Sequence, residues 1–215
     1  MKAFNGSSEL KTQMIAQLDW HAEQDKIVKG SYGDTCENGD FRGCAIGCSI
    51  HSLALIQGRK LNTSDHSLMQ SELGIPIDLA WLIDGLFEAL PLAQSMALPK
   101  RVIAAIAPGA DLSMVIPQFL LWMLSDPKIG SITDAKYDEA KTFVNAVIAI
   151  FDEWVKTGLK PTSDSELAWA ARAAWDARAA RDARAARAAW DERAARAARN
   201  IAAADKLIEL LEAAL

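Results

Sequence analysis

Apolar residues recur every three or four positions along most of the chain, which is the spacing of one face of an α-helix. The first such segment spans residues 7–29, with a serine at its start that can cap a helix and Gly30 after its end. Prolines and glycines divide the next part of the chain into shorter apolar segments. We predict helices there at 44–57, 64–73, 77–90, 99–107, 111–125 and 133–156.

One region lacks helical spacing and is rich in glycine. Residues 30–47 hold five of the twelve glycines, and Asn38-Gly39 is a sequence typical of hairpin turns. We therefore expect at most a tiny hairpin near 31–42. No segment of strand length alternates between polar and apolar residues, so we predict an all-α fold. Its expected form is a compact multi-helix bundle, with a helical core domain at 1–160 and a long C-terminal helix at 165–215.

The C-terminal segment is a repeat of three residues. From 168 to 200 nearly every residue is alanine except the central one of each triplet, which is arginine or tryptophan. Alanine and arginine favour helix, and a period of three on a helix of 3.6 residues per turn distributes the arginines around all sides. Trp169, Trp175 and Trp190 fall within roughly 120° of one another, so we expect them to form one buried face.

The length of this predicted helix raises a question of shape. An unbroken helix over 165–215 would be about 75 Å long, whereas a globule of 215 residues is about 44 Å across. The helix must therefore protrude from the core or break. Asn200, between the triplets and the apolar end, is the expected position of a break.

Charge is distributed unevenly. The formal net charge is −5, yet residues 168–199 carry eight arginines against four acidic residues, so the rest of the chain carries −9. The basic helix could dock on its own acidic body or present an interface to an acidic partner. The exposed candidates for that interface are Arg178, Arg181, Arg184 and Arg196. The interleaved aspartates argue against nucleic acid as a ligand.

Composition excludes several classes of protein. Half of the residues are apolar and a quarter are charged, which is typical of a folded domain. Three cysteines are too few for a disulfide scaffold. No apolar stretch reaches the roughly 20 residues of a membrane span, and the first residues lack the apolar core of a secretory signal. We therefore expect a cytoplasmic protein with no membrane partner.

Cysteine and histidine cluster near the glycine-rich region. Cys36, Cys44, Cys48 and His51 lie within sixteen residues, and the last three share one face of a predicted helix. With Cys36 from the preceding loop they could form a tetrahedral zinc site, although the spacing is looser than in established zinc motifs. Buried free cysteines also behave as small apolar residues, so these side chains could equally belong to the core.

Two other kinds of chemistry are open to the same region. Cys44 follows a glycine at a predicted helix N-terminus, where a thiol pKa is lowered, and His51 or His21 could act as its base. Alternatively, Lys29, Arg42 and the backbone of Gly43 could bind an anion, although no recognised nucleotide motif is present.

Acidic residues and a third histidine lie further along the chain. His66 and Glu72 could add ligands or form an acid–base pair, or they could simply be a surface pair. Asp84 and Glu88 are four residues apart on a predicted helix. Without a histidine partner in their motif, we interpret these two carboxylates as the solvated edge of that helix.

Several segments resemble one protein family. The segment Gly43-Cys44-Ala45-Ile46-Gly47-Cys48-Ser49-Ile50-His51-Ser52 is similar to the corresponding part of uncharacterised proteins from phages and prophage-bearing bacteria. Residues 72–76, 87–91 and 109–113 and the Ala/Arg/Trp-rich tail fit the same family. The resemblance implies an origin in a mobile genetic element and carries over no catalytic residue. Small phage accessory proteins often bind and block a host factor, including host defence machinery.

Two functions follow as hypotheses. The first is a binding protein that engages a host protein or a small nucleotide-like signal, since Arg and Trp dominate binding hot spots. The second is a metal- or thiol-dependent enzyme centred on Cys44, Cys48 and His51, with His21 in reach. An alanine-rich helix could also pack against its own copy, so a homodimer stays open.

Overall fold

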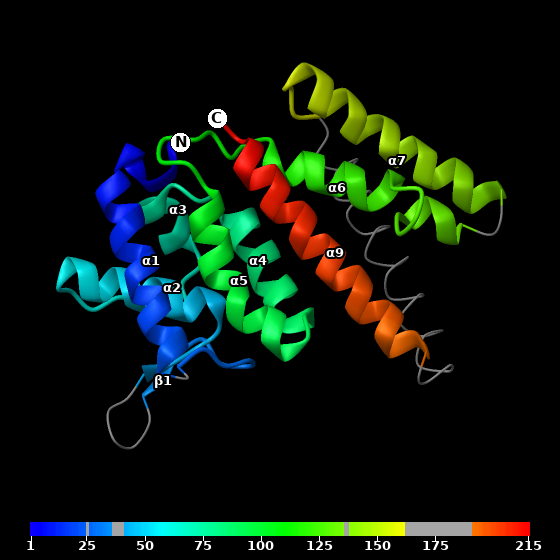
Figure 1. Ribbon diagram of the computed structural model, residues 1–215. Coiled ribbons are helices and arrows are strands. Elements are labelled where there is room, and N and C mark those ends of the chain that lie inside the picture. The colour runs from blue at the N-terminus through cyan, green and yellow to red at the C-terminus, as the bar shows by residue number, and fades with distance from the viewer. Residues whose placement is uncertain (25, 36–40, 136–137, 162–190) are drawn as a thin grey trace. The chain divides into compact units, whose positions relative to one another are not determined.

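The computed structural model confirms the all-α class (Figure 1). It describes residues 1–24, 26–35, 41–135, 138–161 and 191–215. The helices are η1 (Ala3–Gly6), α1 (Ser8–Glu23), α2 (Ala45–Gln57), α3 (Ser67–Leu73), α4 (Ile77–Ala89), α5 (Leu92–Ala105), α6 (Val115–Ser125), η2 (Ser131–Asp134), α7 (Asp138–Thr157) and α9 (Asp191–Ala213). None of the described helices is long and apolar enough to cross a membrane.

A tiny hairpin is the only described sheet. Strands β1 (Asp34–Thr35) and β2 (Phe41–Arg42) pair antiparallel, with Thr35 opposite Phe41. The predicted hairpin near 31–42 is therefore confirmed, and it directly precedes α2 in the chain.

The chain divides into two compact units: Met1–Val115 with Asn200–Leu215, and Ile116–Arg199. The boundary expected at 160 thus lies within the second unit. In the first unit α1 packs against both α2 and α5, and α4 also contacts these two helices. Its core consists of fully buried aliphatic and aromatic side chains, among them Phe4, Met14, Leu18, Ile46, Ile50, Leu53, Leu79 and Phe87.

Local sequence explains where the helices begin and end. The Ser7 hydroxyl accepts a hydrogen bond from the Leu10 amide at 3.1 Å, which caps α1 as predicted. α5 begins earlier than the predicted 99, because Pro91 serves as its N-cap and the helix accommodates Pro99 in its interior. Gly58 and Gly74 end α2 and α3 in left-handed conformations.

The predicted break at Asn200 is absent, and α9 is helical on both sides of this residue. The Asn200 side chain instead donates a hydrogen bond to the Ala89 carbonyl at the end of α4, at 2.7 Å. Further along α9, Asp205 pairs with Arg101 at 2.7 Å, and Leu207 and Leu211 are buried. Asn200 therefore anchors the helix to α4.

The second unit contains its own small apolar cluster. Leu124 of α6 packs with Val147 and Phe151 of α7, and partly buried neighbours surround them. The apolar face predicted for 133–156 is thus the packed face of α7. The tryptophans Trp169, Trp175 and Trp190 lie outside the described residues, so their burial stays a prediction.

Candidate functional site

The first turn of α2 is where the candidate site is assembled. Cys44 is the N-cap residue, and its Sγ accepts a hydrogen bond from the Gly47 amide at 3.4 Å. A Cβ on Gly47 would lie 2.1 Å from the backbone oxygen of Tyr32, so only glycine permits this close approach. The Cys44 amide also donates to the Ser31 carbonyl. These contacts fix the segment that carries Tyr32 against α2.

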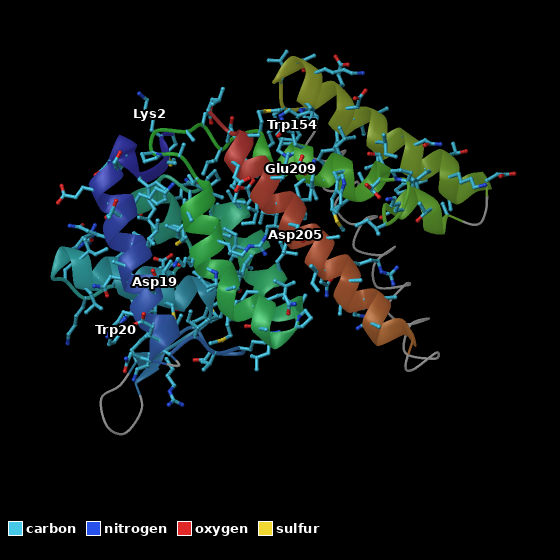
Figure 2. All side chains as sticks on the ribbon, in the orientation of Figure 1. Lys2, Asp19, Trp20, Trp154, Asp205 and Glu209 are labelled. Carbon is cyan, nitrogen blue, oxygen red and sulfur yellow. The ribbon has the colours of Figure 1, made fainter. Side chains whose placement is uncertain are left out.

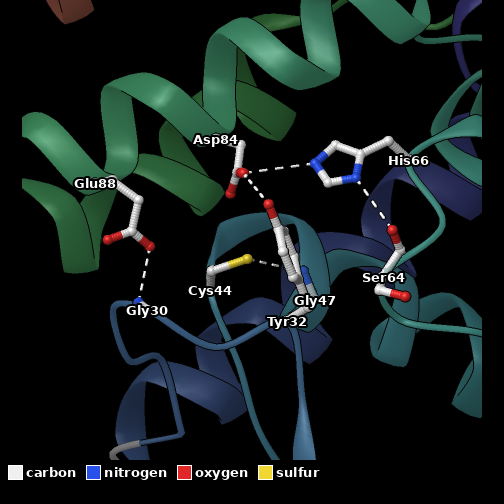
Figure 3. Close-up of polar contacts among 8 residues, drawn as sticks. All are labelled: Gly30, Tyr32, Cys44, Gly47, Ser64, His66, Asp84 and Glu88. Carbon is white, nitrogen blue, oxygen red and sulfur yellow. Dashed lines mark hydrogen bonds and ion pairs between the residues drawn. The ribbon is translucent and has the colours of Figure 1, made fainter.

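A buried carboxylate on α4 is the centre of the site (Figure 3). Asp84 is only 7% exposed, and its Oδ2 accepts a hydrogen bond from the Tyr32 hydroxyl at 3.0 Å. The same oxygen lies 3.6 Å from Nε2 of His66, which is itself 2% exposed. Oδ1 has no hydrogen-bond partner within the described part of the chain. The interpretation of Asp84 as a solvated edge is therefore wrong: three elements meet at its carboxylate.

Two exposed aromatic rings cover this buried pair. The Trp81 indole stacks on the His66 imidazole, with ring centroids 3.6 Å apart and planes 9° from parallel. Tyr32 meets the same imidazole edge-on at 5.3 Å. Trp81 is 52% exposed and Tyr32 39% exposed. We call the group formed by Tyr32, His66, Trp81, Asp84 and Glu88 the α4 site.

Glu88 lies one helical turn beyond Asp84 and is exposed, as expected for it. Its Oε1 accepts a hydrogen bond from the Gly30 amide at 2.9 Å (Figure 3). The Lys29 ammonium donates to the backbone carbonyls of Glu88, at 3.1 Å, and Leu90. A lysine at the last carbonyls of a helix is favourable, so these contacts stabilise the end of α4.

Two of the expected anion-binding residues, Lys29 and Gly43, make contacts within the fold. Lys29 caps α4, and the Gly43 amide donates to the Lys26 carbonyl at 3.0 Å. Arg42 is exposed. Carboxylates, one buried and one exposed, line the same region, and they disfavour an anionic ligand there.

The other two histidines form a separate pair. His51 Nδ1 lies 3.3 Å from His21 Nε2, and Phe41 stacks on His51 with ring centroids 3.9 Å apart. His21 is fully buried. Its burial, followed by the nearby charges of His51 and Lys26, lowers the pKa of His21 to about 4. Burial also lowers the pKa of His51. Both imidazoles are therefore neutral at pH 7.

Cys44 and Cys48 form hydrogen bonds with backbone groups at the start of α2. The Cys48 thiol donates to the Gly43 carbonyl at 3.2 Å, and Cys44 lies near Asp84. Burial raises the pKa of both thiols to about 12, and the charge of Asp84 adds to the shift for Cys44. Both thiols are protonated at neutral pH, which is the opposite of an activated nucleophile.

The metal and interface expectations reach residues that the structure only partly describes. Cys36, one of the four expected zinc ligands, lies outside the described residues. Within them, no group of three or more histidine, cysteine or acidic side chains could hold a metal ion. Arg178, Arg181 and Arg184 also lie outside them, whereas Arg196 is exposed on α9.

Comparisons with protein-family models, with curated proteins and with solved structures find no match for this chain. Fold and site together define an all-α protein in which exposed aromatic rings cover a buried carboxylate–imidazole pair. Sequence reasoning missed Tyr32 and Trp81. One signal was available, because Trp81, Asp84 and Glu88 are spaced three and four apart and so share a helix face.

Proposed function

We propose that this chain is an accessory binding protein, of the kind found in phages and prophages, that engages a host protein through the α4 site. The observation that carries the proposal is the state of Trp81. The residue is 52% exposed, yet its ring plane is held by stacking on the buried His66 imidazole. An exposed tryptophan that is already ordered loses little conformational freedom on binding, which favours it as a hot spot.

Two features of the site support binding over catalysis. The Cys44 and Cys48 thiols are buried and protonated, so they are poor nucleophiles. The only imidazole facing a described carboxylate, His66, is covered by Trp81 and is 2% exposed. A base in this position has little access to a substrate.

The charge of the site favours a protein partner over a nucleotide-like signal. Phosphate groups would meet Asp84 and Glu88, and the nearby Lys29 ammonium is directed to backbone carbonyls. The resemblance to phage and prophage proteins supports a host factor as the partner, with host defence machinery among the candidates.

The test compares three baits in a bacterial host lysate: the wild-type chain, Trp81→Ala and Trp20→Ala. Trp20, labelled in Figure 2, is a matched control because it is a 44% exposed tryptophan on α1. We expect a protein that is retained by wild type and Trp20→Ala and lost with Trp81→Ala. Its affinity, measured with purified components, should fall at least tenfold in Trp81→Ala. No such protein, or one retained equally by all three baits, would overturn the proposal.

A further inference from the structure

Nothing in the described part of the structure requires a glycine at position 85, in the middle of α4. Gly85 is exposed, and a Cβ added to it would meet no described atom within 4 Å. Its backbone is not in the left-handed region. Glycine inside a helix is less favourable than alanine. Gly47 in α2 is the opposite case, since a Cβ there would meet the Tyr32 backbone. Packing therefore requires glycine at position 47, whereas it does not require glycine at position 85.

The neighbours of Gly85 point to a ligand. Trp81 is four residues before it and Glu88 three residues after it, so both side chains flank it on one helix face. Both are exposed. Gly85 thus leaves the helix backbone uncovered by a side chain between the Trp81 indole and the Glu88 carboxylate. Such a gap allows a flat group to approach the helix closely, and any larger residue would fill it.

The charges beside the gap select the ligand. Glu88 uses Oε1 to bind the Gly30 amide, and the Asp84 carboxylate lies buried one helical turn before it. These two carboxylates outnumber the Lys29 ammonium. A flat cation fits this combination: a guanidinium stacks on tryptophan and pairs with carboxylates through several N–H donors.

We infer that the α4 site binds the guanidinium of an arginine side chain from a partner protein, stacked on Trp81 above Gly85 and paired with Glu88. This inference rests on the proposed function and specifies the chemistry that the partner presents. An ammonium ion is a poorer fit, because it is compact and strongly hydrated and does not stack as a plane.

The test is an NMR titration of the tryptophan indole N–H signals in the full chain, with the Trp81 signal assigned from Trp81→Phe. The probe is the peptide acetyl-Gly-Arg-Gly-amide, with the corresponding lysine peptide and agmatine as comparison ligands. We expect the arginine peptide to shift the Trp81 signal saturably and the lysine peptide to bind at least fivefold more weakly. Tighter binding of agmatine than of the arginine peptide would assign the site to a small guanidinium compound. It would overturn the inference that the guanidinium belongs to a partner protein.

Two variants probe the mechanism. Gly85→Ala should raise the Tm by about 2 °C and weaken binding of the arginine peptide at least fivefold. A damaged fold would lower the Tm, so this combination would separate lost binding from lost stability. Glu88→Gln should weaken it similarly, whereas the matched control Glu212→Gln, an exposed carboxylate on α9, should not. Unchanged affinity in Gly85→Ala or Glu88→Gln would overturn the inference.

The two proposals fail separately. A host protein lost with Trp81→Ala, together with no Trp81 response to the arginine peptide, would refute arginine recognition and leave the binding function standing. A normal peptide response without any captured host protein would refute the proposed host partner instead.

Discussion

His66 and His51 both stack on an aromatic ring, but the polar side chains that they face differ in charge. Each imidazole lies flat against an aromatic ring, Trp81 at 3.6 Å and Phe41 at 3.9 Å. Each also faces one polar side chain through a ring nitrogen. For His66 that side chain is the carboxylate of Asp84, and for His51 it is the imidazole of His21.

The difference shows that stacking orients a ring, while the facing side chain decides its charge environment. Two imidazoles in contact disfavour protonation of either one, because each charge would repel the other. His66 faces the carboxylate of Asp84 instead. The histidine pair therefore suits an uncharged interior, whereas the α4 site places negative charge beneath an exposed tryptophan.

Gly47→Ala breaks the α4 site most severely. The added methyl would lie 2.1 Å from the Tyr32 oxygen, and backbone cannot yield as a flexible side chain can. We expect a loss of about 3 kcal/mol in the free energy of unfolding, at the upper end for overpacked positions. Denaturant unfolding measures this loss, with Gly85→Ala as the control that should gain up to about 1 kcal/mol. Equal stability of Gly47→Ala and wild type would show that the contact with Tyr32 is not tight.

Acid should act mainly on the histidine pair. Unfolded His21 binds a proton near its ordinary pKa of 6.5, but folded His21 does so only near 4. The unfolded state thus binds more protons between these values, so stability falls as the pH falls. We expect a loss of about 2 kcal/mol between pH 7 and 5. The carboxylates with lowered pKa values, such as Glu72 and Asp111, protonate below this window.

The variant that tests this prediction is His21→Leu, read by the slope of stability against pH. Its absolute stability is not the measure, because the substitution also changes packing. The slope between pH 7 and 5 should fall markedly in His21→Leu, and His51 should account for part of what remains, because burial lowers its pKa too. The control His66→Gln leaves the contribution of His21 in place. Parallel profiles for His21→Leu and wild type would contradict the assignment.

The helices were predictable from sequence because their signals are local. Ser7 caps α1, glycine or proline marks most of the later ends, and the apolar face of α7 follows from spacing alone. Where local rules failed, contacts between distant residues were responsible. Asn200 was expected to break α9, but its side chain bonds to Ala89 and the helix continues.

The α4 site was harder to predict, since its members come from three parts of the chain. Tyr32 reaches Asp84 across 52 positions. Helical spacing alone places a polar residue such as Asp84 on the solvated edge. Its burial depends on Tyr32 and His66, which only the fold brings to it. Among the described members of the expected Cys/His cluster, Cys44 lies near Asp84 and His51 faces His21, because neighbours on one helix can face different partners. Cys36 lies outside the described residues, so the four-ligand site stays a prediction.

Asp84→Asn gives the smallest effect and the sharpest view of the contrast between the two histidines. Asparagine keeps an oxygen that can accept from Tyr32 but removes the charge, so we expect a stability loss of about 1 kcal/mol, the difference between charged and neutral hydrogen bonds.

The pKa of Tyr32 is raised to about 12, first by burial and then by its hydrogen bond to Asp84 and the charge of that carboxylate. Asparagine leaves the burial and an acceptor in place and removes the charge, so the pKa of Tyr32 should fall in Asp84→Asn but stay above its ordinary value. Ultraviolet titration measures this in a Tyr137→Phe background, which leaves one tyrosine. At pH 11 a larger fraction of the Tyr32 hydroxyl should be ionised beside asparagine than beside Asp84. Identical titration curves would contradict the prediction that the charge of Asp84 acts on Tyr32, and with it the contrast drawn between the two histidines.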